Sequence, residues 1–421
     1  MNAVQAAGAA SFLGRFEGLR ERLPGDREIR DRAAAAFRAG GFPTVRDEAW
    51  KYTSLRPVTE ASFYEPLLSV ADGGDLLAEL PVLDGPRLVF LDGRFRPQLS
   101  VLPENIEVGT FAETAVFGRL ARPDRDPLVA LNTMLTEDGA VIGVPDGVDA
   151  GLLQLVSIAT DVPGRAVAFH PRHCIRLGRG ARLMLLEMSG GGGTYLHNPV
   201  TEAYVADGAV LVHVRLQDES RTAYHLSTLY AEVARGGTYD SFNLNLGARV
   251  ARTEVHARLK GERSATHLNG AQMLGGTQHG DFTTIVSHDA PSCASRQTVK
   301  NVLSGRARGV FQGKIEVARA AQKTDGYQMN QALLLSPEAE IDSKPQLEIY
   351  ADDVKCSHGA TVGELDAEQL FYLRSRGIPE AEARSILVRA FLTEALDAIG
   401  DDTVRASLDR AVDAWWGKQA A

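Results

Sequence analysis

The sequence predicts a mainly β protein whose central part is a coiled parallel sheet, with helical regions at both ends. Apolar and polar residues alternate in several segments after residue 150, which is the period of strands with one buried face. Turn glycines recur at Gly180, Gly208, Gly237 and Gly261, with spacings of 28, 29 and 24 residues. A long run of strands leaves sandwich, closed barrel and β-helix open, and the near-regular spacing favours a β-helix.

Residues 1–150 are predicted to form a helical and mixed N-terminal region. Phe12, Phe16 and Leu19 recur at helical spacing, so residues 1 to about 40 are expected to be helical until the glycines and proline at 40–43 end the pattern.

Two further elements of this region have local signals. Arg87–Phe95 is expected to form a strand and a tight turn, because its Asp-Gly pair favours turn geometry. A short helix is predicted from Asp126 to Leu135.

Residues 151–363 are predicted to form the parallel β-helix core. In its clearest strand, Val210, Val212, Val214 and Leu216 alternate with more polar residues, and only one face is expected to be buried. The other alternating segments are residues 241–246, 253–260 and 311–318.

Residues 364–421 are predicted to form a C-terminal helical region. Asp366 is the expected N-cap of the first helix, with Gln369 three residues later. In the next helix Leu387, Phe391 and Ala395 share one face.

The terminal helix is predicted to be amphipathic. Val404, Leu408, Val412 and Trp415 recur at helical spacing. Trp415 and Trp416 either pack on the chain's own body or offer a docking face to another subunit.

Composition excludes several classes of protein. The net charge of −9 over 421 residues argues against a nucleic-acid-binding protein. No run of about 18 apolar residues predicts a membrane span. The first residues lack the basic start and apolar run of a secretory signal, so a cytoplasmic location is expected.

Cysteine usage agrees with that location. Cys174, Cys293 and Cys356 lie far apart, and no pair has CxxC spacing. Neither a disulfide framework nor a cysteine-cluster zinc site is supported, and free thiols fit a reducing compartment.

Cys356 and His358 are the strongest candidate metal ligands. If their segment is extended, side chains at i and i+2 leave the same face and could reach one metal ion or one partner atom. The alternative is a structural role, in which Cys356 fills apolar space in the core. The segment would form the last coil of a solenoid, whose unpaired backbone groups must be capped or paired with another chain. Two ligands do not complete a site, so a site shared with a second subunit is expected.

Other candidate groups have weaker signals. The glycines at 190–193 are expected to form a flexible turn, because no Gly-Lys-Ser/Thr follows them. His170, His173 and Cys174 are close in sequence, but the two histidines would not share a strand face, so a structural role is favoured. No HExxH or GxSxG motif is present. The remaining histidines considered are scattered through the strand region: His256, His267, His279 and His288.

Four segments carry a resemblance to a known family. They are Arg46–Thr53, Asp325–Ser336, Glu340–Gly363 and Glu368–Ile378. In these segments the chain resembles the SufD family of iron–sulfur cluster assembly proteins, and the similarity spans nearly the whole chain.

The resemblance implies a right-handed parallel β-helix and a complex with the paralogue SufB and the ATPase SufC. SufB would meet the β-helix edge, and SufC would bind ATP and dock on the C-terminal helices. The family's cluster-building pair maps onto Cys356 and His358, which would hold iron or a nascent, transient cluster shared with SufB. No cofactor is expected to be bound stably by this chain alone. Acidic residues near the edge are expected to help capture iron.

The leading hypothesis is therefore a non-enzymatic scaffold subunit for cluster assembly. One alternative is a parallel β-helix polysaccharide lyase or hydrolase, which needs a groove lined by carboxylates and basic residues. Another is a purely structural subunit whose Cys356 merely packs. A homodimer in the absence of SufB is also compatible with an open β-edge.

Overall fold

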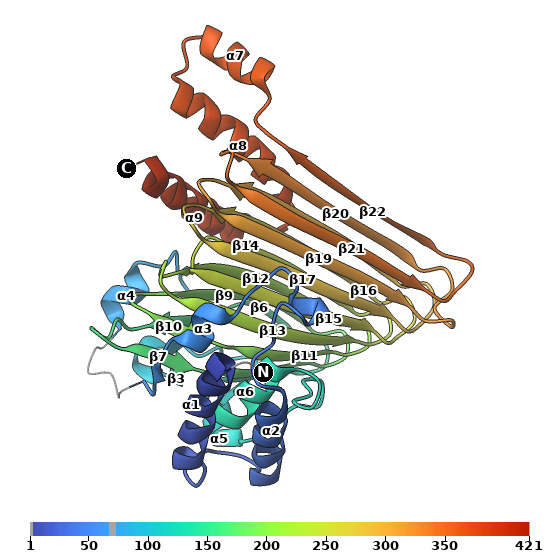
Figure 1. Ribbon diagram of the computed structural model, residues 1–421. Helices are drawn as coiled ribbons and strands as arrows, with labels where there is room; N and C mark the ends of the chain where they lie inside the picture. Colours follow the sequence, from blue (N-terminus) through green and yellow to red (C-terminus); the bar gives the residue numbers. More distant parts are fainter. Residues whose placement is uncertain (1–2, 67–72, 421) are drawn as a thin grey trace.

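A computed structural model describes residues 3–66 and 73–420. Two sheets face each other and carry the chain upward as a solenoid, with helices at both ends (Figure 1). Successive strands alternate between the sheets and pair in parallel with the strand one coil earlier. Sandwich and barrel architectures are thereby set aside, and the predicted parallel β-helix with flanking helices is confirmed.

The strands fall into two sets. The first sheet contains, in spatial order, β21 (Glu340–Ile349), β19 (Arg308–Val317), β17 (His279–His288), β15 (Val250–Leu259), β13 (Tyr224–Val233), β11 (Val200–Val205), β8 (Arg172–Leu177), β5 (Ala140–Val144) and β4 (Glu107–Thr110), with β1 (Phe63–Tyr64), β7 (Ala166–Phe169) and β10 (Tyr195–His197) beside it. The second contains β22 (Lys355–Gly363), β20 (Asp325–Leu334), β18 (Ala294–Leu303), β16 (Ala265–Leu274), β14 (Thr238–Asn245), β12 (Val210–Glu219), β9 (Arg182–Gly191), β6 (Asp149–Ala159), β2 (Arg87–Leu91) and β3 (Arg94–Phe95).

The recurring glycines stand at the corners of the coils. Gly180, Gly208 and Gly236 have φ values of 64°, 68° and 63°, a left-handed conformation that glycine adopts without strain. The N–H of Gly180 donates to Asp207 and that of Gly208 to Arg235, each residue lying at the corner one coil later. The glycine spacing in the sequence is therefore the length of one coil.

The N-terminal region contains helices that cover the first coils. They are α1 (Ala3–Leu19), α2 (Arg27–Gly40), α3 (Arg56–Glu60), α4 (Gly74–Ala78), α5 (Phe111–Thr114) and α6 (Pro127–Leu135), with short 3₁₀ turns η1 (Glu48–Trp50) and η2 (Pro97–Leu99). The expected single helical stretch is interrupted at residues 20–26, and Asp26 caps α2 by accepting from two backbone N–H groups. The predicted hairpin exists as β2 and β3, and Asp126 caps the predicted helix, α6.

The region 1–150 also contributes strands to the solenoid. β2 pairs with β6, and β5 pairs with β8, so the first coil contains strands from before residue 150.

The prediction of a single buried face is wrong for the second half of β12, while β20 keeps the alternation of buried and half-exposed residues over most of its length. In β12, Leu211 and His213 point into the solenoid and are fully buried, whereas Val214 and Leu216 are buried on the outer side. The outer side is covered because the C-terminal helices pack there. Both faces are buried, and the more polar one is the inner face.

Part of the buried polar interior is satisfied by stacking from coil to coil. Asn245 donates to Gln272, Gln272 to Asn301 and Asn301 to Asn330, at 3.1, 2.9 and 2.8 Å. A buried amide needs hydrogen-bond partners, and the equivalent residue of the next coil supplies them. Polar interior positions therefore depend on the presence of a following coil.

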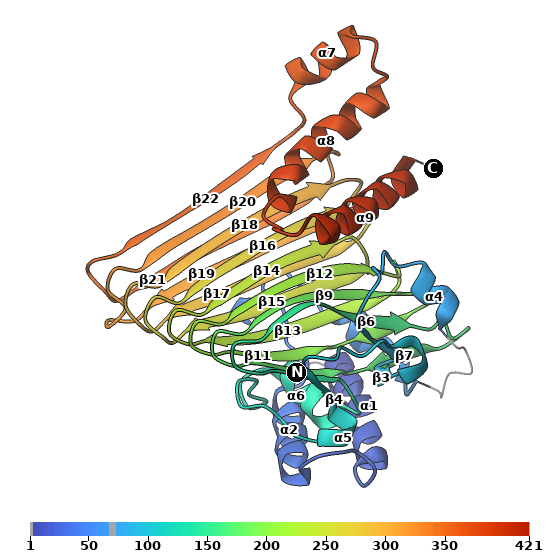
Figure 2. The same cartoon turned by 180° about the vertical axis from the view of Figure 1, so that it is seen from behind.

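The C-terminal region forms α7 (Ala367–Ser375), α8 (Glu380–Leu396) and α9 (Asp402–Ala420). Asp366 caps α7 as predicted. α8 and α9 lie beside the second sheet, and α7 projects beyond the solenoid (Figure 2). No helix of the described residues is long and apolar enough to cross a membrane.

The contact face of α8 differs slightly from the predicted one. Its buried residues centre on Val388, Leu392 and Ala395, whereas Leu387 and Phe391 lie at the margin. α9 buries Val404, Leu408, Val412 and Trp415 as expected. Trp415 is buried in the chain's own core and Trp416 is half-buried against it, as the first of the two alternatives from sequence expects.

Buried neutral histidines make the fold sensitive to acid. Burial lowers the pKa of His170 to about 3 and that of His173 to about 4. The folded chain resists protonation while an unfolded histidine takes up a proton below about pH 6.5, so stability falls as the pH drops below that value. For His170 the loss at pH 5 is about 2 kcal/mol.

The variant His170→Gln should show a smaller fall in stability between pH 7 and pH 5 than the parent chain, by about 2 kcal/mol. Urea unfolding at the two pH values measures the difference. Equal falls in both chains would show that the folded state accepts the proton at this ring.

Candidate functional site

The candidate site lies on β22, the last strand of the solenoid. β22 pairs in parallel with β20 and ends the order of the second sheet, so its other edge has no strand beside it within the described residues. β21 ends the first sheet in the same way. The terminal coil therefore presents two strand edges, and such edges can pair with another chain.

Cys356 and His358 occupy interior-facing positions of this terminal coil. The register pairs Cys356 with Gly326 and His358 with Gln328, both of which face the space between the two sheets. The extended conformation expected for this segment is confirmed, and it places the two side chains on one face. Their positions are about 6.6 Å apart along the strand.

The Cys356 side chain lies at the mouth of the solenoid interior. It packs at the border of a buried cluster that contains Ile315 and Val317. A Cβ atom at Gly326 would lie 3.3 Å from its sulfur, so glycine leaves room for the thiol there. Burial raises the pKa of the Cys356 thiol, Asp325 raises it further, and a backbone N–H acts in the opposite direction. The isolated chain therefore favours the protonated thiol.

The surroundings of His358 contain unused hydrogen-bonding capacity. His358 is exposed and continues a column of inner positions formed by Gln297 and Gln328. Both amide atoms of Gln328 and the hydroxyl of Ser343 on β21 are buried without a protein partner among the described residues. In one column of earlier coils such amides bond to the next coil, although the amide nitrogen of Gln297, below Gln328, also has no protein partner among the described residues.

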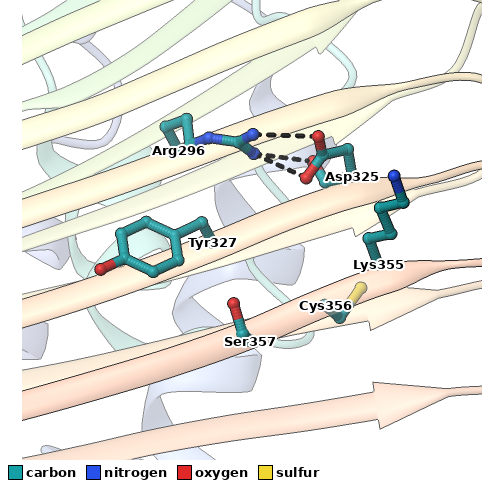
Figure 3. A pocket seen from close by; sticks show the side chains of 6 residues that line it. All are labelled: Arg296, Asp325, Tyr327, Lys355, Cys356 and Ser357. Carbon is teal, nitrogen blue, oxygen red and sulfur yellow. Dashed lines mark hydrogen bonds and ion pairs between the residues drawn. The ribbon is translucent and has the colours of Figure 1, made fainter.

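A polar pocket of about 480 Å³ lies over the outer face of β18, β20 and β22 and reaches Cys356 (Figure 3). Arg296 and Asp325 form a two-bond ion pair in it, at 3.0 and 2.9 Å. The sequence alone did not single out these residues. Among the acidic residues expected near the edge, Asp325 is the one that lines this pocket. The remaining lining residues are Tyr327, Lys355 and Ser357.

A thiol and an imidazole on one strand face can supply two ligands to a transition metal. Thiolate sulfur and imidazole nitrogen suit iron and zinc, which take about four ligands in tetrahedral sites. Because β22 has an open edge, further ligands can come from a second chain. The geometry fits half of a shared metal site.

The other sequence candidates are not gathered into a site. Cys174 and Cys293 are buried, and the sulfur of Cys293 lies 3.3 Å from the Ser264 hydroxyl. His170 and His173 are buried, in agreement with the structural role favoured from sequence. The scattered histidines each have a local partner: His256 contacts Glu254, His267 contacts Asp240, His279 contacts Thr53 and His288 contacts Ser295.

The glycines at 190–193 are only partly a turn. Gly190 and Gly191 end β9, and a bend begins at Gly192. A Cβ at Gly191 would lie 2.2 Å from the Ala159 carbonyl oxygen. The requirement for glycine here is close contact between coils, and no helix follows that could bind a phosphate.

Two family models match the chain. Residues 159–391 match the model described as SUF system FeS cluster assembly, SufBD core domain, and residues 26–152 match the SufBD protein N-terminal region. Together they include the solenoid, the strand with Cys356 and His358, and most of the N-terminal region.

Curated relatives are similar over most of their length. The iron–sulfur cluster assembly protein SufD of Escherichia coli is 36% identical over 374 residues, 87% of each chain. An iron–sulfur cluster assembly SufBD family protein of Synechocystis is 31% identical over 410 residues, covering 91% of this chain and 90% of the relative. The chloroplastic protein ABCI7 of Arabidopsis thaliana is 29% identical over 402 residues, covering 90% and 83%.

Proposed function

The chain belongs to the SufBD family of iron–sulfur cluster assembly proteins and is a homologue of SufD, and from this premise we propose that it is a non-enzymatic scaffold subunit. In this role it helps to acquire iron and to form the nascent cluster at an interface with SufB. Cys356 and His358 supply its ligands. Iron and the cluster are cargo, held transiently and passed on.

The observation that carries the proposal is the terminal coil of the solenoid, whose last strands have open edges. Cys356 and His358 face inward on the last strand, beside buried polar groups that have no partner among the described residues. Ile349, Tyr350 and Val362 are exposed at the same end. Apolar side chains, a free strand edge and incomplete ligands on one surface favour a protein partner. A second copy of this chain can use the same edge when SufB is absent.

The raised pKa of the Cys356 thiol fits a site that becomes active only in a complex. A metal ion or a nearby cation stabilises the thiolate, and neither is supplied by the buried side chains around the sulfur. The subunit alone then keeps its thiol protonated and less reactive, and ligand binding starts when SufB closes the end.

We place the ATPase SufC on the C-terminal helices. Phe371 and Tyr372 on α7 are 73% and 57% exposed, which leaves an apolar surface for a partner. Residues 364–366 alone separate β22 from α7, so movement of α7 acts directly on the strand with Cys356 and His358. SufC dimerisation on binding ATP would pull these helices and open the interface to incoming iron or sulfur.

A short Gly-Ser linker inserted after Glu364 should uncouple the helices from β22. The variant is expected to bind SufB and SufC and to retain ATP hydrolysis, while cluster formation per complex falls. Co-purification, phosphate release and bound iron and sulfide measure the three properties.

The same linker inserted at Gly164, in the exposed turn before β7, is the matched control and should leave all three properties unchanged. Full cluster formation by the Glu364 insertion would contradict mechanical coupling. Failure of the parent chain to co-purify with SufB or SufC would contradict the assigned partners.

A further inference from the structure

A second set of metal-ligating side chains lies inside the solenoid, far along the stack from β22. His197 on β10, Glu219 at the end of β12 and His225 on β13 bring one ligand atom each within 4.8 Å of one another. β10 pairs with β13 in parallel, and the register places His197 directly beside His225. Adjacent coils therefore bring the two imidazoles together, and the corner after β12 delivers the carboxylate.

The carboxylate of Glu219 lies between the two rings. Its Oε1 is 2.9 Å from Nδ1 of His197, and its Oε2 is 2.7 Å from Nδ1 of His225. The ring centroids are 5.0 Å apart and the ring planes are nearly perpendicular, at 81°. Ligand atoms bound at about 2.1 Å to one tetrahedral ion lie about 3.4 Å apart, so these separations need to widen by only about 0.5–0.7 Å to admit a shared ion.

Internal hydrogen bonding does not fully satisfy the cluster. Nδ1 of His197 is hydrogen-bonded to Glu219, whereas Nδ1 of His225 approaches Glu219 without the alignment of a hydrogen bond and has no other partner among the described residues. Tyr195 leaves the same face of β10 as His197, and its buried hydroxyl also lacks a well-aligned bond. The three ligand residues are at most 5% exposed. Buried polar atoms without partners in a native fold call for a ligand.

A neighbouring amide holds the carboxylate of the cluster in place. Gln217 donates to Oε2 of Glu219 at 2.9 Å and accepts from the N–H of Gly247, which fixes the carboxylate. Glu219 also lines a surface pocket of about 630 Å³ between α4, the corner after β12 and α9, with Leu80 and Arg410.

We propose that His197, Glu219 and His225 bind one divalent first-row transition-metal ion of the Fe²⁺ or Zn²⁺ type. Two histidines and one carboxylate are the ligand set of non-haem iron sites and of several zinc sites. The site has nitrogen and oxygen ligands only, which distinguishes it from the sulfur-containing site at Cys356. It lies within one chain and needs no partner.

The test uses Co²⁺ as a spectroscopic probe on the full-length chain after removal of metal. The parent chain should bind one equivalent at this cluster and develop visible d–d absorption without the near-ultraviolet band of cobalt–thiolate bonds. The double variant, in which Cys356→Ala and His358→Ala are combined, should show the same visible absorption of bound Co²⁺. Glu219→Gln and His225→Gln should each weaken binding by about tenfold or more.

X-ray absorption of the Zn²⁺-loaded double variant keeps the test valid if a ligand variant fails to fold. Two imidazoles and only nitrogen or oxygen ligands are expected. Sulfur ligation, loss of binding in the double variant, or failure of the parent chain to retain Co²⁺ and Zn²⁺ in equilibrium dialysis would each overturn the proposal. The proposed cluster role of Cys356 and His358 is unaffected by these outcomes.

Discussion

Replacing Cys356 by alanine, or His358 by alanine, should lower the cluster formed by the assembled complex by about tenfold or more. Each change removes one of two ligands that the last strand offers, and the open edge has no second thiol or imidazole in an equivalent place on β22. Iron, sulfide and visible absorption per complex, after anaerobic reconstitution with SufB and SufC, measure the loss.

Assembly of the complex should survive both changes. Cys356 is half-buried at the margin of its cluster and His358 is exposed, so truncation leaves the solenoid core intact. Ser357 lies between the two residues and points to the opposite face of the strand. Ser357→Ala is therefore the matched control, with normal cluster yield.

The same pair of variants separates the scaffold role from the purely structural one. If Cys356 merely packs, both alanine variants will form cluster as the parent complex does, with at most a small loss of stability. That result would remove the ligand roles assigned here. A loss confined to one variant would assign the role to that residue alone.

The fold could be predicted because neighbouring coils have similar lengths. Each turn of the chain returns to the same corner, where glycine adopts a left-handed conformation, so Gly180 and Gly208 mark successive coils. The i, i+2 relation of Cys356 and His358 is equally local, since any extended strand places them on one face.

The inner face could not be predicted from alternation alone. In β12 the apolar residues Val214 and Leu216 meet the C-terminal helices, and His213 faces inward, because stacked coils satisfy buried polar groups. A pattern of two-residue period identifies two faces without saying which is covered by helices.

The pairs of residues that meet between neighbouring coils could not be predicted from the sequence either, with one exception. Coil lengths vary, so the pairing of Gln328 with His358 follows only from the register. His197 and His225, however, are 28 residues apart, the same spacing as Gly180 and Gly208. Searching for metal-ligating residues one coil apart would have found this pair.

The largest effect on stability is expected at Arg252, on the outer face of β15. Its guanidinium is 1% exposed and forms ion pairs with Asp281 on β17 and with Glu254, the latter at 2.6 Å. The Trp50 ring lies 4.0 Å from the guanidinium, and the Thr53 hydroxyl donates to Asp281.

These contacts attach the N-terminal segment around Trp50 and Thr53 to the solenoid. The same segment reaches later coils through the Ala49 carbonyl, which accepts from Gln312, and through the ion pair between Glu48 and Lys344. One of the segments that resembles the SufD family, Arg46–Thr53, therefore has a structural role in holding the N-terminal region on the sheet.

Arg252→Leu should destabilise the chain by about 3–5 kcal/mol, because Asp281 is left as a buried charge without its cation. Arg258→Leu on the same strand is the control. Arg258 is 59% exposed in its ion pair with Asp289, so its loss should cost about 0.5 kcal/mol or less. Urea unfolding monitored by circular dichroism gives both values.

Acid titration and a double variant also test whether the buried ion pairs of Arg252 stabilise the chain. Burial raises the pKa of the Glu254 carboxyl, but Arg252 and His256 together outweigh burial and hold the pKa well below its ordinary value. The contribution of the pair Arg252–Glu254 to stability is therefore present above about pH 4.3 and is lost as the pH falls toward the lower pKa of the folded chain.

Arg252→Leu combined with Asp281→Leu should recover part of the lost stability, because no unpaired charge then remains at Asp281. Equal stability losses for Arg252→Leu and Arg258→Leu would show that the buried cation does not hold the two regions together.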